Sequence, residues 1–350
     1  MIYLSNMSDI FVGTLAGVLV TLITGWLGIQ LAVRLKLMDI PGALPRKQHT
    51  LPTPYAGGIA LFLSMLVLLI GSGLWKSSEL RGLFLAVLVI FVFGIWDDYK
   101  KLRPVVKLCG QLLAAVILIY SGIYIRIFES TQFFVGGHHQ FVWLDWGVTL
   151  LWIVGVTNAF NLVDSMDGLA VGLSAWAFAF FMLAMLDSQQ RVLSVLSAMV
   201  LGICLGLLFY NVSPARLFLG DAGAQSLGLL LASIAILYTP QVSYQKSSWF
   251  VPILLVGVPI FDTALVSFSR LRRRKPIYLG GMDHTYHRLV ALGLEPGRAV
   301  LTMQIAALIL ECTAFVALAL PPRQANGIFV GCLIAGFVCM FYLDSPKRWP

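Results

Sequence analysis

The sequence predicts an all-α protein that crosses a membrane about ten or eleven times. Hydrophobic residues make up 59% of the 350-residue chain and charged residues only 11%, whereas soluble domains carry roughly 25% charged residues. The apolar residues also gather in runs of about 17–25 residues, the length that crosses a bilayer as a helix. Helices are expected because lipid offers the backbone no hydrogen-bond partner.

Eleven apolar runs are predicted to span the membrane. They cover residues 10–33, 56–74, 81–96, 105–121, 148–163, 168–186, 191–210, 222–238, 250–271, 298–320 and 327–343. Little of the chain remains for a soluble module, so we expect one integral-membrane domain over residues 1–350. The five cysteines lie inside apolar runs without paired spacing, which favours small core residues over disulfides or zinc ligands.

The basic residues predict the orientation of the chain. Eighteen lysines and arginines fall in loops on one side of the predicted spans and six on the other. The positive-inside rule makes the first side cytoplasmic, with the N-terminus outside and the C-terminus in the cytoplasm. The net charge of +8 is then explained by the basic loops that the positive-inside rule places on the cytoplasmic side of the lipid bilayer. We therefore expect no nucleic acid as a partner.

Six aspartates follow or interrupt the apolar runs, where charge is costly. They are Asp97, Asp98, Asp164, Asp167, Asp221 and Asp262. Ionisable residues at such depth are functional-site candidates by default, and five of the six fall on the predicted cytoplasmic side. A group of carboxylates on one face is typical of a site for a hard divalent cation and a phosphorylated substrate.

Two of these motifs have simpler alternatives. Asp97 and Asp98 end the third predicted span as a candidate metal or base pair, although Asp97 could instead pair with Lys101 one helical turn later. Asp221 opens the eighth span as a candidate metal ligand, although aspartate is also a good helix N-cap. The two roles of Asp221 are compatible, because a helix N-terminus also attracts phosphate.

A second polar segment repeats every three residues, as Asn158, Asn161, Asp164 and Asp167. Each step of three turns roughly 60° short of a full helical turn, so these side chains cannot share one face. We therefore predict that the helix ends near Asp164 and that residues 165–168 form a polar turn. Hydrogen bonds between helices could explain the asparagines, but they would not explain the two aspartates.

Two cytoplasmic loops carry candidate substrate-binding residues. In the segment 283–288 a short helix ending at Gly293 would place His284, His287 and Arg288 on one face, which suits an anionic diphosphate. A surface amphipathic helix is the alternative. In the first loop Arg46, Lys47 and His49 precede a proline-bracketed turn, a pattern that indicates an ordered loop contacting phosphate.

Three further expectations concern single features. Asp262 lies about nine residues inside the ninth span, where it either lines a cavity or bonds a neighbouring helix, and Pro259 is expected to kink that span. The external segment 122–147 alternates in polarity and could form a β-hairpin. A transporter is the competing functional class, but transporters keep their charged site near the bilayer midplane between structural repeats, and we detect no repeat.

Six ordered motifs resemble one known family. The stretches DIPGALPRKQHTLPTPYAGG, GIWDDYKK, NAFNLVDSMDGLAVG, FLGDAG, PIFDT and DHTYHRL occur in the order found in the polyprenyl-phosphate N-acetylhexosamine-1-phosphate transferases. The resemblance is to the branch that moves GlcNAc-1-phosphate onto undecaprenyl phosphate more than to the branch that moves phospho-MurNAc-pentapeptide. It implies a Mg²⁺ or Mn²⁺ enzyme of the cytoplasmic membrane, a UDP-N-acetylhexosamine donor, release of UMP and a possible homodimer.

The resemblance also implies residue roles. It makes Asp97 and Asp98 the family's paired aspartates, which act as catalytic groups or metal ligands, and Asp221 the Mg²⁺ ligand. The polar segment falls in the family's active site, with Asp164 and Asp167 as catalytic groups and Asn158 and Asn161 contacting the nucleotide sugar. The segment 283–288 with His284, His287 and Arg288, which we call the histidine loop, would hold the diphosphate. Tyr286 stands where the family often has a third histidine, and Ala224 replaces a usual serine.

Overall fold

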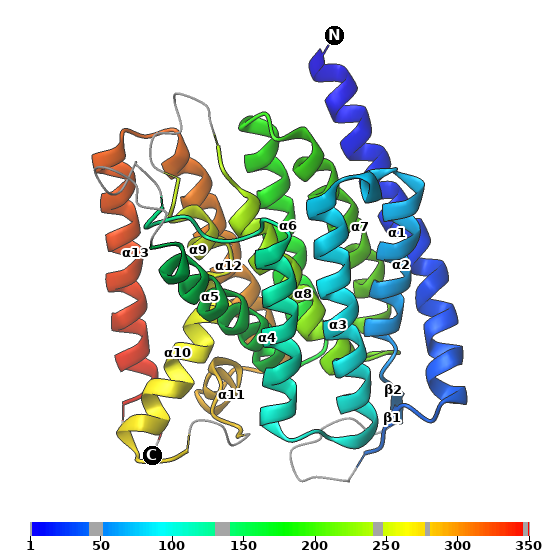
Figure 1. Cartoon of the computed structure of the whole chain (residues 1–350). Coiled ribbons are helices and arrows are strands. Elements are labelled where there is room, and N and C mark those ends of the chain that lie inside the picture. Colours follow the sequence, from blue (N-terminus) through cyan, green and yellow to red (C-terminus); the bar gives the residue numbers. More distant parts are fainter. Residues whose placement is uncertain are drawn as a thin grey trace.

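The computed structural model describes residues 2–41, 52–129, 141–240, 248–276, 281–345 and 349. In these ranges the chain is a bundle of helices, as predicted (Figure 1). The helices are α1 (Ile2–Arg34), α2 (Gly57–Gly71), α3 (Ser78–Lys100), α4 (Pro104–Tyr120), α5 (Val142–Val163), α6 (Leu169–Asp187), α7 (Arg191–Asn211), α8 (Gly220–Leu237), α9 (Val251–Leu255), α10 (Gly257–Arg272), α11 (Thr285–Ala291), α12 (Pro296–Leu318) and α13 (Pro322–Leu343), with a short 3-10 helix at Leu74–Lys76.

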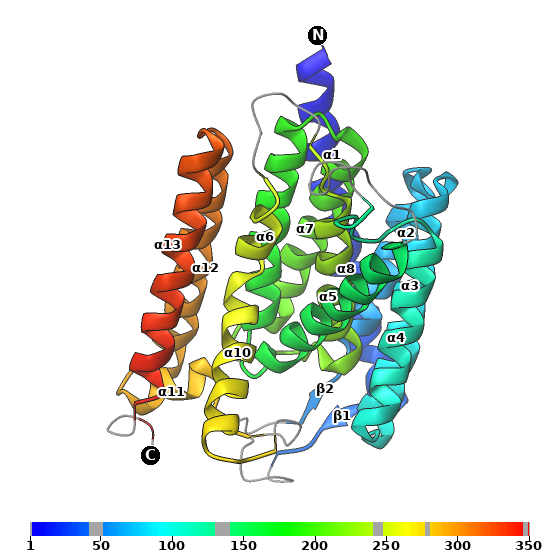
Figure 2. The same ribbon diagram turned by 60° about the vertical axis from the view of Figure 1, so that its left-hand side comes forward.

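Ten of the eleven predicted spans coincide with one of these helices each. Eight of the described helices are long and apolar enough to cross a membrane, and α2 and α4 are shorter apolar helices. The chain is therefore an integral membrane protein that crosses the bilayer several times. Two short strands, β1 (Met38–Asp39) and β2 (Thr53–Pro54), pair antiparallel. They lie at the same end of the bundle as α11 and the chain's C-terminus (Figures 1 and 2); we call it the loop end.

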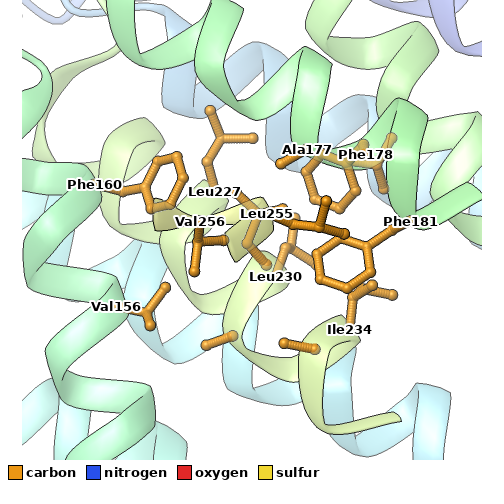
Figure 3. Packing of buried hydrophobic residues seen from close by; sticks show 14 of the residues in the cluster. Val156, Phe160, Ala177, Phe178, Phe181, Leu227, Leu230, Ile234, Leu255 and Val256 are labelled. Atoms are coloured by element: carbon orange, nitrogen blue, oxygen red, sulfur yellow. The ribbon is translucent and has the colours of Figure 1, made fainter. Parts of the chain in front are cut away.

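Helix α8 runs through the middle of the bundle and packs against α2, α3 and α5. Apolar side chains from α5, α6, α8 and the α9–α10 junction interdigitate at its centre (Figure 3). Because lipid is as apolar as these side chains, close packing holds the helices together more than exclusion of water does. This rigid centre fixes the N-terminus of α8 at the loop end, where Asp221 lies.

Small residues let three helices meet at the start of α8. A Cβ added to Gly58 of α2 would come within 2.6 Å of the Ala222 Cβ. A Cβ added to Gly94 of α3 would clash with the Ala222 backbone. Backbone N–H groups of Gly57 and Gly58 also donate to the carbonyls of Phe218 and Leu219, each at 3.0 Å. Glycine at positions 58 and 94 therefore permits the close approach that brings α3 and α8 into register.

The ninth predicted span is broken rather than merely kinked. Helix α9 ends at Leu255 and α10 begins at Gly257. Pro259 explains the position of the break, because its ring clashes with the carbonyl four residues earlier, on Leu255, and it has no N–H to donate there. The expectation of one helix over residues 250–271 is therefore wrong.

The predicted external β-hairpin is also wrong in the part that the structure describes. Residues expected in its second strand begin α5 instead. Asp145 of α5 accepts the backbone N–H groups of Ile127, Phe128 and Glu129 at 2.8–3.0 Å. A fully buried carboxylate thus satisfies donors that a hairpin would have paired with a second strand.

Candidate active site

Lys107 of α4 stands between two of the predicted site carboxylates. Its Nζ lies 3.0 Å from Asp97 Oδ2 and 2.9 Å from Asp221 Oδ2, so α3 and α8 each direct a carboxylate at one cation. Asp97 Oδ1 accepts the N–H of Leu102 at 2.5 Å, which fixes the carboxylate at the α3–α4 turn. The alternative in which Asp97 pairs with Lys101 is wrong, because the cation comes from the next helix.

Asp98 has a different task from its neighbour. Its two carboxylate oxygens accept the N–H groups of Asp221 at 2.8 Å and of Ala222 at 3.3 Å. These are N–H groups that α8 cannot satisfy by itself, and an anion there is favoured by the helix dipole. Asp221 lies in the first turn of α8 and Leu219 is the N-cap, so the N-cap role considered for Asp221 is wrong. Asp98 instead holds the turn that carries Asp221.

An amide cluster lies one helical turn further into the bundle. Gln111 of α4 exchanges hydrogen bonds with Asn158 of α5, at 2.7 and 3.1 Å, and donates to Gln225 of α8 at 2.9 Å. Gln111 and Gln225 follow Lys107 and Asp221 by four residues, so each pair shares a helix face. The interhelical alternative therefore holds for Asn158, whose amide is already engaged.

The segment after Asn158 forms the predicted polar turn. Helix α5 ends at Val163, with Asp164 at its C-cap, and α6 begins after Gly168. Neither Asn161 nor Asp164 makes a side-chain hydrogen bond within the described part of the chain, so both are available to a ligand. Asp167 Oδ2 accepts the N–H of Ala215 at 3.2 Å, which ties the turn to the segment before α8.

The carboxylates of this turn influence one another. Burial, together with the neighbouring carboxylates of Asp98 and Asp167, raises the pKa of Asp164 to about 8. Burial therefore favours the protonated form of Asp164, which can donate a hydrogen bond. The influence of Asp98 indicates that the Asp164 turn lies near Asp98, which in turn holds the N-terminus of α8.

Helix α11 carries the histidine loop to the same end of the bundle. Burial and the Asp167 carboxylate raise the pKa of Tyr286, so this tyrosine lies near the polar turn. Tyr286 Oη and His287 Nδ1 are both buried, and neither has a hydrogen-bond partner in the described part of the chain. Burying polar groups in this state costs free energy, and a ligand that reached them would recover it.

His284, which precedes α11, contacts Asp262 of α10. Its Nδ1 lies 2.8 Å from Asp262 Oδ2, and Asp262 Oδ1 accepts the N–H of Thr285 at 2.6 Å. Of the two roles left open for Asp262, the structure shows the bond to a neighbouring segment. The ring of His287 lies 5.9 Å from that of His284, centroid to centroid, so the two imidazoles are neighbours as predicted.

Arg288 does not present its guanidinium at the surface of the loop. It is 1% exposed, and its Nη1 donates to Asp344 Oδ1 at 2.9 Å and to the Leu343 carbonyl at 3.2 Å. The Trp349 ring covers it, with the guanidinium 5.1 Å from the ring centroid. Arg288 therefore anchors α11 to the end of α13. Its predicted contact with an anionic diphosphate stays a prediction.

The first loop is described only at its base. Arg46, Lys47 and His49 lie outside the described residues, and their predicted contact with phosphate stays a prediction. Tyr55, just after β2, donates a hydrogen bond to Asp39, and burial, with the carboxylates of Asp39, Asp98 and Asp164, raises its pKa. The base of this loop therefore lies against the acidic cluster.

Comparison with known proteins agrees with this arrangement. The family model "Glycosyl transferase family 4" matches residues 80–239. A probable undecaprenyl-phosphate N-acetylglucosaminyl 1-phosphate transferase of Bacillus subtilis is 32% identical over 89% of this chain and 86% of its own length. This chain belongs to glycosyl transferase family 4.

Other members of the family differ in their named substrates. A decaprenyl-phosphate N-acetylglucosaminephosphotransferase of Mycobacterium leprae is 29% identical over 92% of this chain and 87% of its own length. A phospho-N-acetylmuramoyl-pentapeptide-transferase of Heliobacterium modesticaldum is 37% identical, but over 54% of this chain and 62% of its own length. The relatives named for GlcNAc transfer are thus matched over more of the chain. No relative among them is named as a transporter.

Sequence reasoning missed three residues that organise the site. Lys107 is one of four basic residues between 100 and 107, and nothing in its spacing distinguishes it from the others. Gln111 is a polar residue inside an apolar run, which is the signal that could have marked it. Asp344 follows the last span and gives no signal at all, because its partners come from α10 and α11.

Proposed function

We propose that the protein transfers an N-acetylhexosamine 1-phosphate, with GlcNAc as the sugar, from a UDP-sugar to undecaprenyl or another polyprenyl phosphate. UMP is released and a polyprenyl-diphosphate-sugar is formed. The observation that carries the proposal is the convergence of Asp97 and Asp221 on Lys107, close to the polar turn that carries Asp164. This polar site lies at the end of an apolar bundle, where a lipid phosphate and a water-soluble nucleotide can meet.

The proposal includes Mg²⁺, or Mn²⁺ in its place. Two carboxylate oxygens already face one ammonium group at 3.0 and 2.9 Å. A divalent cation would be neutralised by the same two negative charges. In the described ranges no three His, Cys, Asp or Glu side chains are grouped to hold a metal alone. Mg²⁺ commonly takes only one or two carboxylates and completes its shell with substrate phosphate and water. Asp97 and Asp221 fit that requirement, and the ion would neutralise the diphosphate charge.

The reaction requires positioning more than proton removal. An oxygen of the lipid phosphate forms a bond to the sugar-bearing phosphorus, and the bond from that phosphorus to the bridging oxygen of UMP breaks. A phosphate monoester has a second pKa near 6, so at neutral pH the nucleophile is mostly dianionic already and no general base is needed. We infer that Asp97 holds the site in register with Lys107, and that Asp98 does so through the N-terminus of α8.

The other side chains serve the donor. The protonated form of Asp164 and the Asn161 amide would donate hydrogen bonds to phosphate or sugar oxygens. Lys107 supplies a positive charge beside the diphosphate. His284 and His287 are placed by α11 at the same end of the bundle. With the predicted orientation, this end faces the cytoplasm at the inner cell membrane, and the product is the first lipid-linked intermediate of an envelope polysaccharide. A homodimer stays a prediction.

Lipid analysis of reactions with purified protein tests the proposal. Detergent-purified protein is incubated with undecaprenyl phosphate, Mg²⁺ and one donor at a time: UDP-GlcNAc, UDP-GalNAc or UDP-MurNAc-pentapeptide. We expect undecaprenyl-diphosphate-GlcNAc by mass spectrometry of the extracted lipid, and none with Asp221→Asn. A lipid product from UDP-MurNAc-pentapeptide alone would replace the GlcNAc assignment with the activity named for the Heliobacterium relative. No product from any donor, in folded protein, would refute the transferase.

A further inference from the structure

Asp262 is a carboxylate that neither the metal site nor the polar turn uses. It lies on α10, is completely buried, and both of its oxygens are engaged by the segment that begins α11. Burying a carboxylate costs several kcal/mol unless it is well paired, on the order of the penalties known for buried ions. The pairing with His284 is therefore a specific feature of this fold.

The geometry of the pair defines the tautomer of the histidine. A carboxylate is an acceptor only, so the 2.8 Å contact between His284 Nδ1 and Asp262 Oδ2 requires the proton on Nδ1. The Nε2 atom is then the ring nitrogen that remains for a ligand. It accepts a hydrogen bond when the ring is neutral and donates one when the ring is protonated.

The neighbouring histidine has no such partner. His287 Nδ1 is buried and has no hydrogen-bond partner among the described residues. Burial and the nearby His284 lower the pKa of His287 more than the carboxylates of Asp262 and Asp283 raise it, so this ring stays neutral. The two histidines of the loop thus differ in their surroundings, because the Nδ1 atom of His284 is held by the Asp262 carboxylate.

We infer that Asp262 is a positioning residue, which fixes His284 as the Nδ1–H tautomer and leaves its Nε2 to accept a hydrogen bond from a hydroxyl or N–H group of the donor. The inference rests on the proposed function for the identity of that ligand. Its structural half, the tautomer, stands independently and is measured without any substrate.

Asp262 also has a purely structural bond, which must be separated from this role. Its Oδ1 accepts the N–H of Thr285 at 2.6 Å. Thr285 is the first residue of α11, and the preceding residue has φ −69° and ψ 161°. Proline is well tolerated at this first position, and the residue before a proline prefers this extended conformation. Thr285→Pro therefore removes the bond to the backbone and leaves the bond to His284.

The test is the nitrogen NMR spectrum of histidine in detergent-purified protein labelled with ¹⁵N-histidine, with His284→Gln used to assign the signals. We expect His284 to be protonated at Nδ1 in the wild type and in Thr285→Pro, and at Nε2 in Asp262→Asn. Asparagine can still accept the Thr285 N–H, but its amide nitrogen would donate to Nδ1. Protonation of His284 at Nε2 in the wild type, or an unchanged tautomer in Asp262→Asn, overturns the inference.

Kinetics then connect the tautomer to the reaction. Asp262→Asn should lower kcat by about 10²- to 10⁴-fold, with a smaller change in donor KM. Losses of activity of this size are seen when the carboxylate that orients an imidazole is replaced. Thr285→Pro should stay within about threefold of the wild type. Equal losses in the two variants would show that Asp262 acts only as a helix cap. If the wild type is inactive but the tautomers behave as stated, the proposed function fails and the positioning of His284 stands.

A second variant covers the case in which Asp262→Asn does not fold. His284→Asn keeps a donor close to the Nδ1 position and so keeps the Asp262 bond, but it has no equivalent of Nε2. We expect it to melt within a few degrees of the wild type and to lose at least 100-fold in kcat. Wild-type turnover in His284→Asn would refute the role of Nε2.

Discussion

Replacement of Lys107 by methionine is the most informative perturbation of the site. Methionine has nearly the same length and removes only the charge. In the wild type the ammonium separates the carboxylates of Asp97 and Asp221. Without it, two anions face each other across the junction of α3, α4 and α8, and the same place becomes a better site for a divalent cation.

The structure sets the size of the effect. Both carboxylate oxygens lie within 3.0 Å of Lys107 Nζ, so they are at most about 6 Å apart. Two unit charges at about 6 Å repel by about 3 kcal/mol at an effective dielectric constant of about 20. Water reaches the site, because the Asp221 side chain is 21% exposed. We therefore expect Lys107→Met to destabilise the protein by about 1–3 kcal/mol in the absence of metal.

Thermal unfolding in detergent, with EDTA and with millimolar Mg²⁺, measures this effect. The variant should unfold several degrees below the wild type in EDTA, and Mg²⁺ should raise its midpoint by more than it raises that of the wild type. Lys100→Met, an exposed position one helix away, is the matched control and should follow the wild type. A Mg²⁺-induced rise no larger in Lys107→Met than in the wild type would refute the reasoning, because it would mean that the carboxylates do not share a cation site.

Three further predictions follow from buried groups. Asp164 has a folded-state pKa of about 8, above its ordinary value near 4, so the folded state loses stability as the pH rises from about 4 to 8 and this proton is lost. Asp164→Asn should therefore raise the unfolding midpoint at pH 8.5 more than at pH 5, and an equal effect at both pH values would contradict this. Burial would raise the pKa of Asp344, but hydrogen bonds from Arg273, Ser269 and Arg288 keep that pKa below its ordinary value. Asp344→Asn leaves buried arginine charge unpaired, so thermal unfolding should show a loss of about 3–5 kcal/mol in the free energy of unfolding at pH 7. A loss below about 1 kcal/mol would show that Arg288 finds another partner. Tyr286→Phe removes a buried hydroxyl that has no partner within the described ranges, so stability should be unchanged or higher while donor KM rises. An unchanged KM would show that the hydroxyl contacts no donor.

The sequence predicted the bundle well because its evidence is local. Ten of the eleven apolar runs give one helix each, and the three-residue spacing from Asn158 to Asp167 correctly placed the helix end close to Asp164. The errors arose where a distant side chain replaced a local partner. Asp145 satisfies the backbone donors that were assigned to a hairpin, and Pro259 breaks its helix four residues upstream of the ring.

The sequence predicted which residues form the site better than it predicted which residues contact one another there. The six motifs named Asp97, Asp98, Asp164, Asp167, Asp221 and the histidine loop, and the structure gathers them at one end of the bundle. The partners of these residues come from other helices: Lys107 for Asp97 and Asp221, Asp262 for His284, and Asp344 for Arg288. Sequence spacing carries no information about such contacts, because they depend on how whole helices pack.

The fate of the donor's two phosphates tests the central claim most directly. Purified protein is given UDP-GlcNAc labelled with ³²P in its β-phosphate, together with undecaprenyl phosphate and either Mg²⁺ or EDTA. Transfer of sugar 1-phosphate moves the label into the extracted lipid and releases unlabelled UMP, and it should stop in EDTA. Label that remains in released UDP, with sugar attached to a lipid monophosphate, would contradict the account.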